Sequence, residues 1–343
     1  MSKNVSIKTI AKESGYSATT VSRVINGHTK KYRISDEAKE KILKIAKEYN
    51  YKANPVAVNL RLKKSYTIGL VIPSLDNPFF VNVTSLLNRE LTKRGYNIIL
   101  TESYDEPGTE KEMIMQLLER NVDGVLLIPS QGNTENVELL EETISSGVPI
   151  LCIDRYIKNS KIPFITTDNQ YGAYIGVKHL IENGHKKIAC IQGLPDSTPS
   201  EDRKKGYLSA LDEFDLEPFY IGGDEFSYMC GYRETQILLQ KKDLPTAIFA
   251  MSSNIALGVM KAVEENGYSI PEDLSIVGFD NYEFLDHIKV PLTSIAQPID
   301  EISHIAVKVL LDYVDGKMDD SDWENPSLKP SMILRDSVLD LTS

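Results

Sequence analysis

The stretch Ser6–Asn26, SIKTIAKESGYSATTVSRVIN, decides how the N-terminal part of this chain folds. Apolar residues recur three and four positions apart on both sides of Gly15, which predicts two short amphipathic helices separated by a turn. Ser6 and Ser17 stand where each helix would begin, and a serine there can cap the first backbone N–H groups. The second helix would bury its valines and keep short polar side chains outside at its start. This pattern is typical of a helix-turn-helix, whose second helix enters a DNA major groove.

The charge of the first 64 residues supports a DNA partner over the alternative, a small helical hairpin with an ordinary polar face. Residues 1–64 carry 15 Lys and Arg against 5 Asp and Glu, a net charge of +10. The whole chain has a net charge of −11, which leaves −21 for residues 65–343. A basic segment, residues 1–64, joined to an acidic one, residues 65–343, indicates a phosphate-binding head attached to a part that does not itself bind DNA.

Two further segments complete the expected head. A third helix should begin after Ser35, with two acidic residues in its first turn, where the helix dipole favours them. The loop before it, 27–33, carries three Lys and Arg, and we interpret it as a phosphate contact; a solvated turn is the alternative. Asn54 and Pro55 suit the start of another helix, but only about two turns follow, which is too short to be stable alone. We therefore expect a hinge that folds only when held.

Length and composition set the broad class. With 343 residues and 41% hydrophobic content, the chain should hold more than one domain at ~100–200 residues each. No apolar run approaches the ~20 residues of a membrane span, and residues 1–12 are polar, unlike a secretory signal. Three scattered cysteines lack metal-ligand spacing and indicate buried thiols. We expect a cytoplasmic protein with no membrane partner, no metal site and no cofactor.

From Thr67 onward, buried strands alternate with helix-length segments. We expect one series of strands at 68–72, 97–100, 124–128 and 149–153, and a second that begins near Phe164 and continues at 187–192, 247–250 and 275–279. Amphipathic helices should lie at 171–183, 203–214, 231–241, 254–266 and 298–315. The fold class is therefore α/β, with two lobes of doubly wound parallel sheets whose ligand binds between them, at the carboxyl ends of the strands.

From end to end, the chain resembles bacterial transcription regulators of the lactose/purine repressor type, the LacI/GalR family. The matching stretches are 7–26, the 54–60 hinge, IGLVIPSLDNPFF (68–80), TDNQYGA (167–173), HLIENGHKKIA (179–189), VGFDN (277–281) and PLTSIAQP (291–298). The resemblance implies a helix-turn-helix head (1–52), a hinge helix (53–64) and a periplasmic-binding-protein-like core (65–343). We expect lobe one at about 65–162 plus 294–322, and lobe two at about 163–293 plus 323–343.

The resemblance further implies a homodimer that reads a near-palindromic operator. Leu60 falls where such proteins wedge a paired leucine into the minor groove and kink the duplex; docking on the core lobe is the alternative. Ala18 and Thr19 fall where base preference is set, and Ser17 and Thr20 where phosphate is contacted. Ala18 offers a methyl contact, which suits a thymine. The predicted DNA-binding residues are Ser17, Ala18, Thr19, Thr20, Ser22, Arg23, Asn26, Lys30, Tyr32, Asn54, Ala57, Asn59, Leu60 and Arg61.

A small effector, often a sugar or its phosphate, is implied for the cleft between the lobes. Arg203 offers a planar fork of donors, and carboxylates at strand ends suit paired hydroxyls of a carbohydrate. The predicted effector-binding residues are Asp76, Asn77, Phe79, Asp154, Arg203, Phe226, Ser252, Asp280 and Asn281. Asp76 and Asn77 could instead cap the following helix, and we assign Phe80 to the core.

Three departures from the family pattern are visible. Met251-Ser252-Ser253 stands at a strand end lining the cleft, where the family commonly has an aspartate. Any polar contact from these residues to the effector would therefore be uncharged. The segment 27–34 is about three residues longer than in the lactose repressor. No leucine-heptad tail follows residues 335–337, which argues against the tetramer that some relatives form.

Two other classes of protein share part of this pattern. A solute-binding protein of the sugar-binder type, without a DNA role, would share the two lobes but not the basic head. An enzyme would need a nucleophile–base set, a metal-ligand cluster or a glycine-rich phosphate loop, and we find no such motif and no catalytic residue. The sequence therefore predicts a sequence-specific DNA-binding transcriptional repressor controlled by a small effector.

Overall fold

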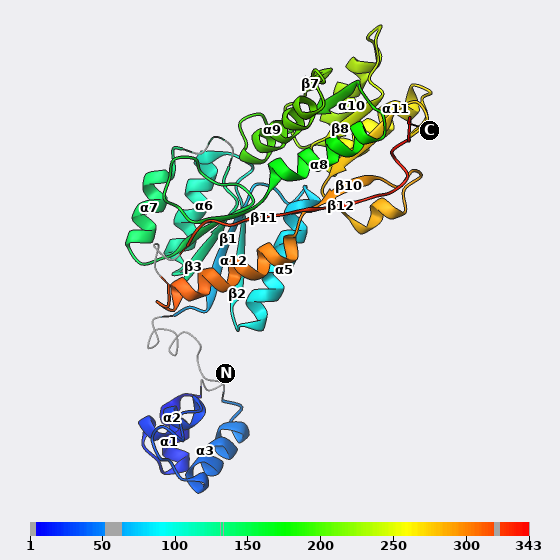
Figure 1. The fold of residues 1–343 in the computed structure, drawn as a ribbon. Helices are drawn as coiled ribbons and strands as arrows, with labels where there is room; N and C mark the ends of the chain where they lie inside the picture. The colour runs from blue at the N-terminus through cyan, green and yellow to red at the C-terminus, as the bar shows by residue number, and fades with distance from the viewer. Residues whose placement is uncertain (1–4, 52–63, 131, 133, 319–322, 343) are drawn as a thin grey trace. The chain divides into compact units, whose positions relative to one another are not determined.

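The computed structural model describes residues 5–51, 64–130, 132, 134–318 and 323–342. It divides into two compact units, Met1–Ser65 and Tyr66–Ser343 (Figure 1). None of the helices among the described residues is both long enough and apolar enough to cross a membrane.

The first unit is a three-helix head. Its helices are α1 (Ile7–Ser14), α2 (Ala18–Ile25) and α3 (Asp36–Glu48). The three predicted serine caps are all present, because the hydroxyls of Ser6, Ser17 and Ser35 each accept a hydrogen bond from the third residue of their helix. Between α1 and α2, Gly15 takes a left-handed conformation with φ of 77°, which favours glycine. The helices enclose a small core of Ile10, Val21, Val24, Ile42 and Ala46.

The end of α2 is closed by a Schellman motif. Gly27 has φ of 74°, its N–H donates to the Val24 carbonyl at 3.1 Å, and the His28 N–H donates to the Arg23 carbonyl at 2.9 Å. The loop then turns again and returns to the head at Ile34, which packs against the core. The longer loop is therefore a folded turn that is anchored at both ends.

The first lobe of the second unit is built on a six-stranded sheet, whose order is β11-β5-β4-β3-β1-β2. Its strands are β1 (Thr67–Ile72), β2 (Asn97–Glu102), β3 (Gly124–Leu127), β4 (Ile150–Ile153), β5 (Phe164–Thr167) and β11 (Ser327–Leu328), and all their pairings are parallel. Apolar side chains of α5 (Pro78–Lys93) and α12 (Ile299–Val314) form one core cluster with this sheet. Those of α6 (Pro107–Glu119) and α7 (Val137–Ser145) form another.

The second lobe has a sheet of order β12-β10-β9-β8-β6-β7. Its strands are β6 (Ile188–Ile191), β7 (Tyr220–Gly222), β8 (Ala247–Ala250), β9 (Ser275–Phe279), β10 (Thr293–Ala296) and β12 (Ser331–Ile333), and only β12 runs antiparallel to its neighbour. The helices of this lobe are α8 (Asn169–Glu182), α9 (Thr198–Glu213), α10 (Tyr228–Leu239) and α11 (Ser253–Glu265), with a 3₁₀ turn at Glu283–Asp286. Together they bury one continuous core around Tyr207, Phe249 and Phe279.

The doubly wound parallel sheets are confirmed, but three strands were expected in the wrong lobe. β11 pairs with β5 in the first sheet, although we placed residues 323–343 in lobe two. Phe164 of β5 pairs with Cys152 of β4 in the first sheet, although we expected the second series to begin there. Ser294 of β10 pairs with Gly278 of β9 in the second sheet, although we placed residues from 294 onward in lobe one. The loop 154–163 before β5 holds no helix, so the regular alternation of strand and helix fails at that point. A buried apolar run does not reveal which sheet it joins.

Candidate functional site

The outer surface of α2 presents the short polar side chains that the sequence predicts for DNA contact. Ser17, Ala18 and Thr19 are exposed at the start of the helix, and Thr20 is half-buried. The Ser17 hydroxyl accepts from the Thr20 N–H at 3.1 Å and lies 2.9 Å from the Thr20 hydroxyl. Ser17 therefore caps the helix, and these two hydroxyls are held as a pair at its N-terminus.

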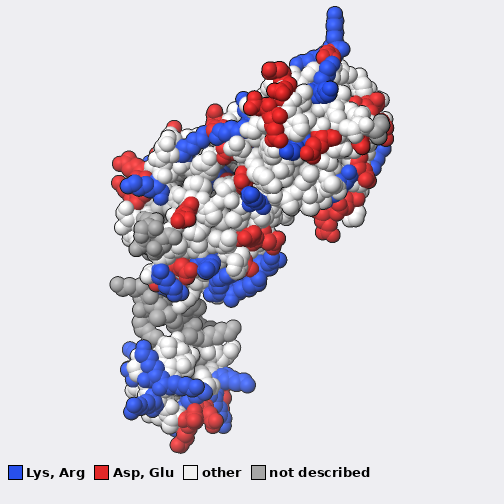
Figure 2. All heavy atoms as spheres, in the orientation of Figure 1, with Lys and Arg blue, Asp and Glu red and all other residues white. Residues whose placement is uncertain are grey.

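The later residues of α2 are more constrained. The Asn26 amide donates to the Ser22 carbonyl at 2.7 Å and to the Ser22 hydroxyl at 3.3 Å, so both side chains are engaged along the helix. The Arg23 guanidinium lies over the ring of Tyr32, while Lys30 and Tyr32 are exposed on the loop. Lys and Arg side chains cover much of the head in view in Figure 2, with Asp and Glu gathered at one end. The remaining predicted DNA-binding residues, Asn54, Ala57, Asn59, Leu60 and Arg61, lie outside the described residues.

The second unit contains a pocket between its lobes, at the carboxyl ends of both sheets, where parallel sheets bind their ligands. The lining residues follow strands of both lobes: Asn77, Phe79, Phe80, Asp154, Arg155, Pro199, Arg203, Phe226, Ser252, Asp280 and Gln297. The empty volume is about 310 Å³. This volume includes space that is open to solvent.

Arg203 on α9 is the buried centre of the pocket, with only 3% of its surface exposed. Its Nε donates to the Asn169 side-chain oxygen at 2.7 Å, and its Nη1 donates to the Met251 carbonyl. Its guanidinium carbon lies 3.6 Å from the ring centre of Phe279, which supports the flat group from one side. These two bonds use the single N–H of Nε and one of the two N–H groups of Nη1.

Two buried carboxylates share the pocket with this arginine. Asp154 and Asp280 follow β4 and β9, and both take left-handed conformations, with φ of 66° and 73°. Such conformations cost energy and cluster at functional sites. Burial raises the pKa of Asp154 to about 6, although the charges of Arg203 and Arg155 oppose the shift. Burial also raises the pKa of Asp280, which accepts a 2.6 Å hydrogen bond from the Gln297 amide.

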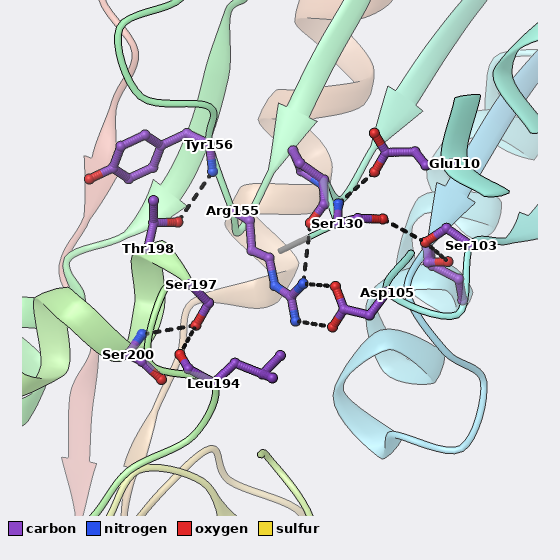
Figure 3. A network of polar contacts seen from close by, with 12 residues as sticks. Ser103, Asp105, Glu110, Ser130, Arg155, Tyr156, Leu194, Ser197, Thr198 and Ser200 are labelled. Atoms are coloured by element: carbon purple, nitrogen blue, oxygen red, sulfur yellow. Dashed lines mark hydrogen bonds and ion pairs between the residues drawn. The ribbon is translucent and has the colours of Figure 1, made fainter. Parts of the chain in front are cut away.

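Arg155 forms a rigid wall of the pocket, shown in Figure 3. Its Nη1 and Nη2 donate to the two carboxylate oxygens of Asp105 at 2.6 and 3.1 Å, and Nη1 also reaches the Pro129 carbonyl. Next to it, the buried Glu110 carboxylate accepts from the Ser130 N–H at 2.5 Å, and its pKa is raised mainly by burial. These contacts fix the loop after β3 and the arginine together, so this side of the pocket is preformed.

Side chains of the two lobes also meet along the seam beside the pocket. The Tyr156 N–H donates to the Thr198 hydroxyl at 3.4 Å (Figure 3). The Tyr156 phenol donates to Asp202 at 3.2 Å. Lys158 forms an ion pair with Glu201 on the same helix, α9. The loop that carries Asp154 is therefore tied directly to the helix that carries Arg203.

Seven of the nine predicted effector-binding residues line this pocket: Asn77, Phe79, Asp154, Arg203, Phe226, Ser252 and Asp280. Two of them also cap helices, because Asn77 accepts from the Phe79 N–H and Ser252 from the Ile255 N–H. Asp76 is exposed and lines a wider hollow beside the pocket. Asn281 does not line the pocket, because its side-chain oxygen accepts from Arg335 at 2.7 Å and from the Ser294 hydroxyl at 3.2 Å.

Four lining residues were missed: Phe80, Arg155, Pro199 and Gln297. Phe80 is buried as expected, yet it also faces the ligand space beside Phe79. Arg155 adjoins Asp154, which follows β4, so its position after a strand was a usable signal. Pro199 is the second residue of α9 and does not directly follow a strand. Among the described residues, no cluster of three or more His, Cys, Asp and Glu is arranged to hold a metal, and the three cysteines are buried.

A helix-turn-helix head and a two-lobed core with a polar pocket define a DNA-binding transcription regulator with a small-molecule-binding core. Comparison with known families agrees: residues 6–54 match the model of bacterial regulatory proteins of the lacI family, and residues 177–338 match the periplasmic binding protein-like domain. The chain belongs to the lacI family of bacterial regulatory proteins.

The similarity extends over the whole chain. The ribose operon repressor of Haemophilus influenzae is 32% identical, with 98% of this chain and 99% of that protein covered. The regulator NtdR of Bacillus subtilis, which controls an NTD biosynthesis operon, is 35% identical over 90% of this chain and 93% of its own length. A Lac repressor dimer bound to operator and the anti-inducer ONPF superposes with a TM-score of 0.88 at 26% identity, covering 98% of this chain and all of that one.

A ribose-bound structure is also similar. It is a LacI family regulator from Enterococcus faecium, 30% identical, with a TM-score of 0.72 that covers 80% of this chain and all of that one.

Proposed function

We propose that this protein represses transcription as a homodimer, with the α2 helix of each subunit reading one half-site of a near-palindromic operator. The exposed residues at the start of α2 support this role, since they are short and can approach base edges and phosphates closely. The operator-bound dimer of the similar Lac repressor supports the assembly. The hinge residues 53–64 would enter the minor groove between the two heads, with Leu60 as the wedge.

The effector, we propose, is a neutral monosaccharide of the ribose type. The observation that carries this proposal is the charge balance of the pocket, in which Asp154 and Asp280 face Arg203 and Arg155. An anionic ligand such as a sugar phosphate would meet two carboxylates, whereas sugar hydroxyls can donate to the carboxylates and accept from the arginines. Three phenylalanines, Phe79, Phe80 and Phe226, offer apolar faces to the C–H side of a sugar ring. The ribose operon repressor and the ribose-bound regulator among the relatives support the same class.

This role does not require catalysis. The similar proteins are transcriptional repressors and regulators, so we propose that the chain is not an enzyme and that it acts in the cytoplasm, where bacterial DNA lies. The alternative of a solute-binding protein without a DNA role does not fit membership of the lacI family.

The experiment that tests the effector is calorimetric titration of the full-length protein with D-ribose, other neutral pentoses and hexoses, ribose 5-phosphate and hypoxanthine. We expect binding of a neutral sugar to the wild-type protein and a loss of at least 100-fold in affinity for Arg203→Ala. Preferential binding of ribose 5-phosphate or of hypoxanthine would contradict the neutral-sugar assignment. Equal affinity of the variant would contradict the site.

A further inference from the structure

The loop between α2 and α3 holds an aromatic ring against the one charged side chain of α2. Tyr32 is 42% exposed, and the guanidinium carbon of Arg23 lies 3.8 Å from the centre of its ring. This distance is well within the ~6 Å over which a cation and an aromatic ring attract each other. A second cation, Lys31, is more distant, with its Nζ 5.8 Å from the same ring centre. Arg23 is therefore the principal partner of Tyr32.

The position of the ring is set by the folded backbone of the loop. At one end, the Schellman motif at Gly27 fixes the direction in which the chain leaves α2. In the middle, the Tyr32 N–H donates to the His28 carbonyl at 3.2 Å. At the other end, the Ile34 N–H donates to the Thr29 carbonyl at 3.0 Å, and Ile34 packs into the head core. Tyr32 is thus presented to Arg23 by a structured turn.

An ordered arginine matters for reading DNA. Arginine reads guanine through paired hydrogen bonds to O6 and N7, which require one orientation of the guanidinium plane. An unrestrained arginine loses much side-chain freedom when it adopts that orientation. A ring stacked on the guanidinium restricts it before DNA arrives, while the N–H edges stay available because stacking uses the face of the group.

We propose that Tyr32 is a positioning residue that orients Arg23 to read a base of the operator. The loop 27–34 then contributes to sequence preference through Arg23. This inference rests on the proposed role of α2 as the recognition helix, and its test must separate the two.

The test uses full-length protein and a duplex that this protein selects from a random-sequence pool. Affinity is measured for the selected duplex, for versions with each conserved G·C pair changed to A·T, and for a random duplex. We expect Tyr32→Ala to weaken binding to the selected duplex by about two- to fivefold per half-site, and hence about four- to twenty-fivefold for a dimer. Binding to the random duplex should not change.

Two variants of Tyr32 and one neighbouring variant serve as controls. Tyr32→Phe keeps the ring and should behave like wild type, whereas Tyr32→Leu keeps bulk without a π face and should behave like Tyr32→Ala. Lys31→Ala removes a loop charge but leaves the stack, so it should weaken all duplexes alike and lower the salt dependence. Thermal unfolding of each full-length variant shows whether the head remains folded.

The double variant decides the mechanism. If Tyr32 acts through Arg23, Tyr32→Ala should have no further effect once Arg23→Ala is present. An equal loss in both backgrounds, or a loss for Tyr32→Phe as large as for Tyr32→Ala, would overturn the proposal, because the tyrosine would then contact DNA by itself. If Arg23→Ala leaves the preference for the selected duplex unchanged, both the recognition role of α2 at this position and the inference fail. If Arg23 matters and Tyr32 does not, only the inference fails.

Discussion

Replacing Asp154 by asparagine should stabilise the unliganded protein at neutral pH. The carboxyl is buried, and its pKa is about 6 in the folded protein against an ordinary value of 3.8. Between these two values the folded state binds more protons than the unfolded state, so stability falls as pH rises through this window. The destabilisation by the buried Asp154 charge is absent below about pH 4 and complete above about pH 6. The difference between the two pKa values corresponds to about 3 kcal/mol in the free energy of unfolding. This is an upper limit, because asparagine also lacks the negative charge that attracts Arg155 and Arg203.

The assay is equilibrium unfolding of full-length wild type and Asp154→Asn in urea, at about pH 7.5 and about pH 4. The single tryptophan, Trp323, reports on the core, since its indole N–H donates to the Phe164 carbonyl at 3.1 Å. Asp300→Asn is the matched control, because Asp300 is an exposed carboxylate in a surface pair with Arg89 and should change stability little. We expect the advantage of Asp154→Asn at pH 7.5 to vanish at pH 4. A variant less stable than wild type at pH 7.5, or an advantage that persists at pH 4, would refute the reasoning.

Three further outcomes are expected. Effector affinity should decrease by up to about tenfold per pH unit below about pH 6, because sugar hydroxyls donate best to an ionised Asp154; a flat calorimetric profile from pH 7.5 to 5 would contradict this. Asp280→Asn should weaken effector binding by at least tenfold, and Asn281→Ala should weaken it less, because Asn281 contacts Arg335 and does not line the pocket. Calorimetric titration of both variants with the same sugar tests this order, and the reversed order would contradict the assignment. Gly27→Ala should destabilise the head by about 1 kcal/mol through its φ of 74° alone, since no atom lies within 4 Å of the added methyl; unchanged thermal unfolding of the head would count against the strain.

The head was predictable from the sequence because its determinants are local. Serine caps, a left-handed glycine and apolar residues at helical spacing act within a few residues of one another, and α1, α2 and α3 begin where these signals stand. The contact between Arg23 and Tyr32 was not predictable, because it depends on a loop whose path is set by a chain of backbone hydrogen bonds.

The pocket was predictable only in part, for a related reason. Side chains that follow directly after strands, such as Asp154 and Asp280, reach the carboxyl edge of the sheet wherever that strand lies. The partner that removes Asn281 from the pocket, Arg335, is 54 positions further along the chain, and no local signal reveals it. Gln297 joins the pocket because the chain recrosses between the lobes there, and its amide meets Asp280 through tertiary structure.

The central claim is that the pocket between the lobes controls operator binding, and one comparison tests it most directly. Full-length wild type and Arg203→Ala would each be bound to the selected duplex and titrated with a panel of neutral pentoses and hexoses, with operator affinity as the readout. We predict that at least one sugar shifts the operator dissociation constant of the wild type tenfold or more, while Arg203→Ala binds the duplex and does not respond. An equal response in the variant, or no response of the wild type to any sugar of the panel, would contradict the account.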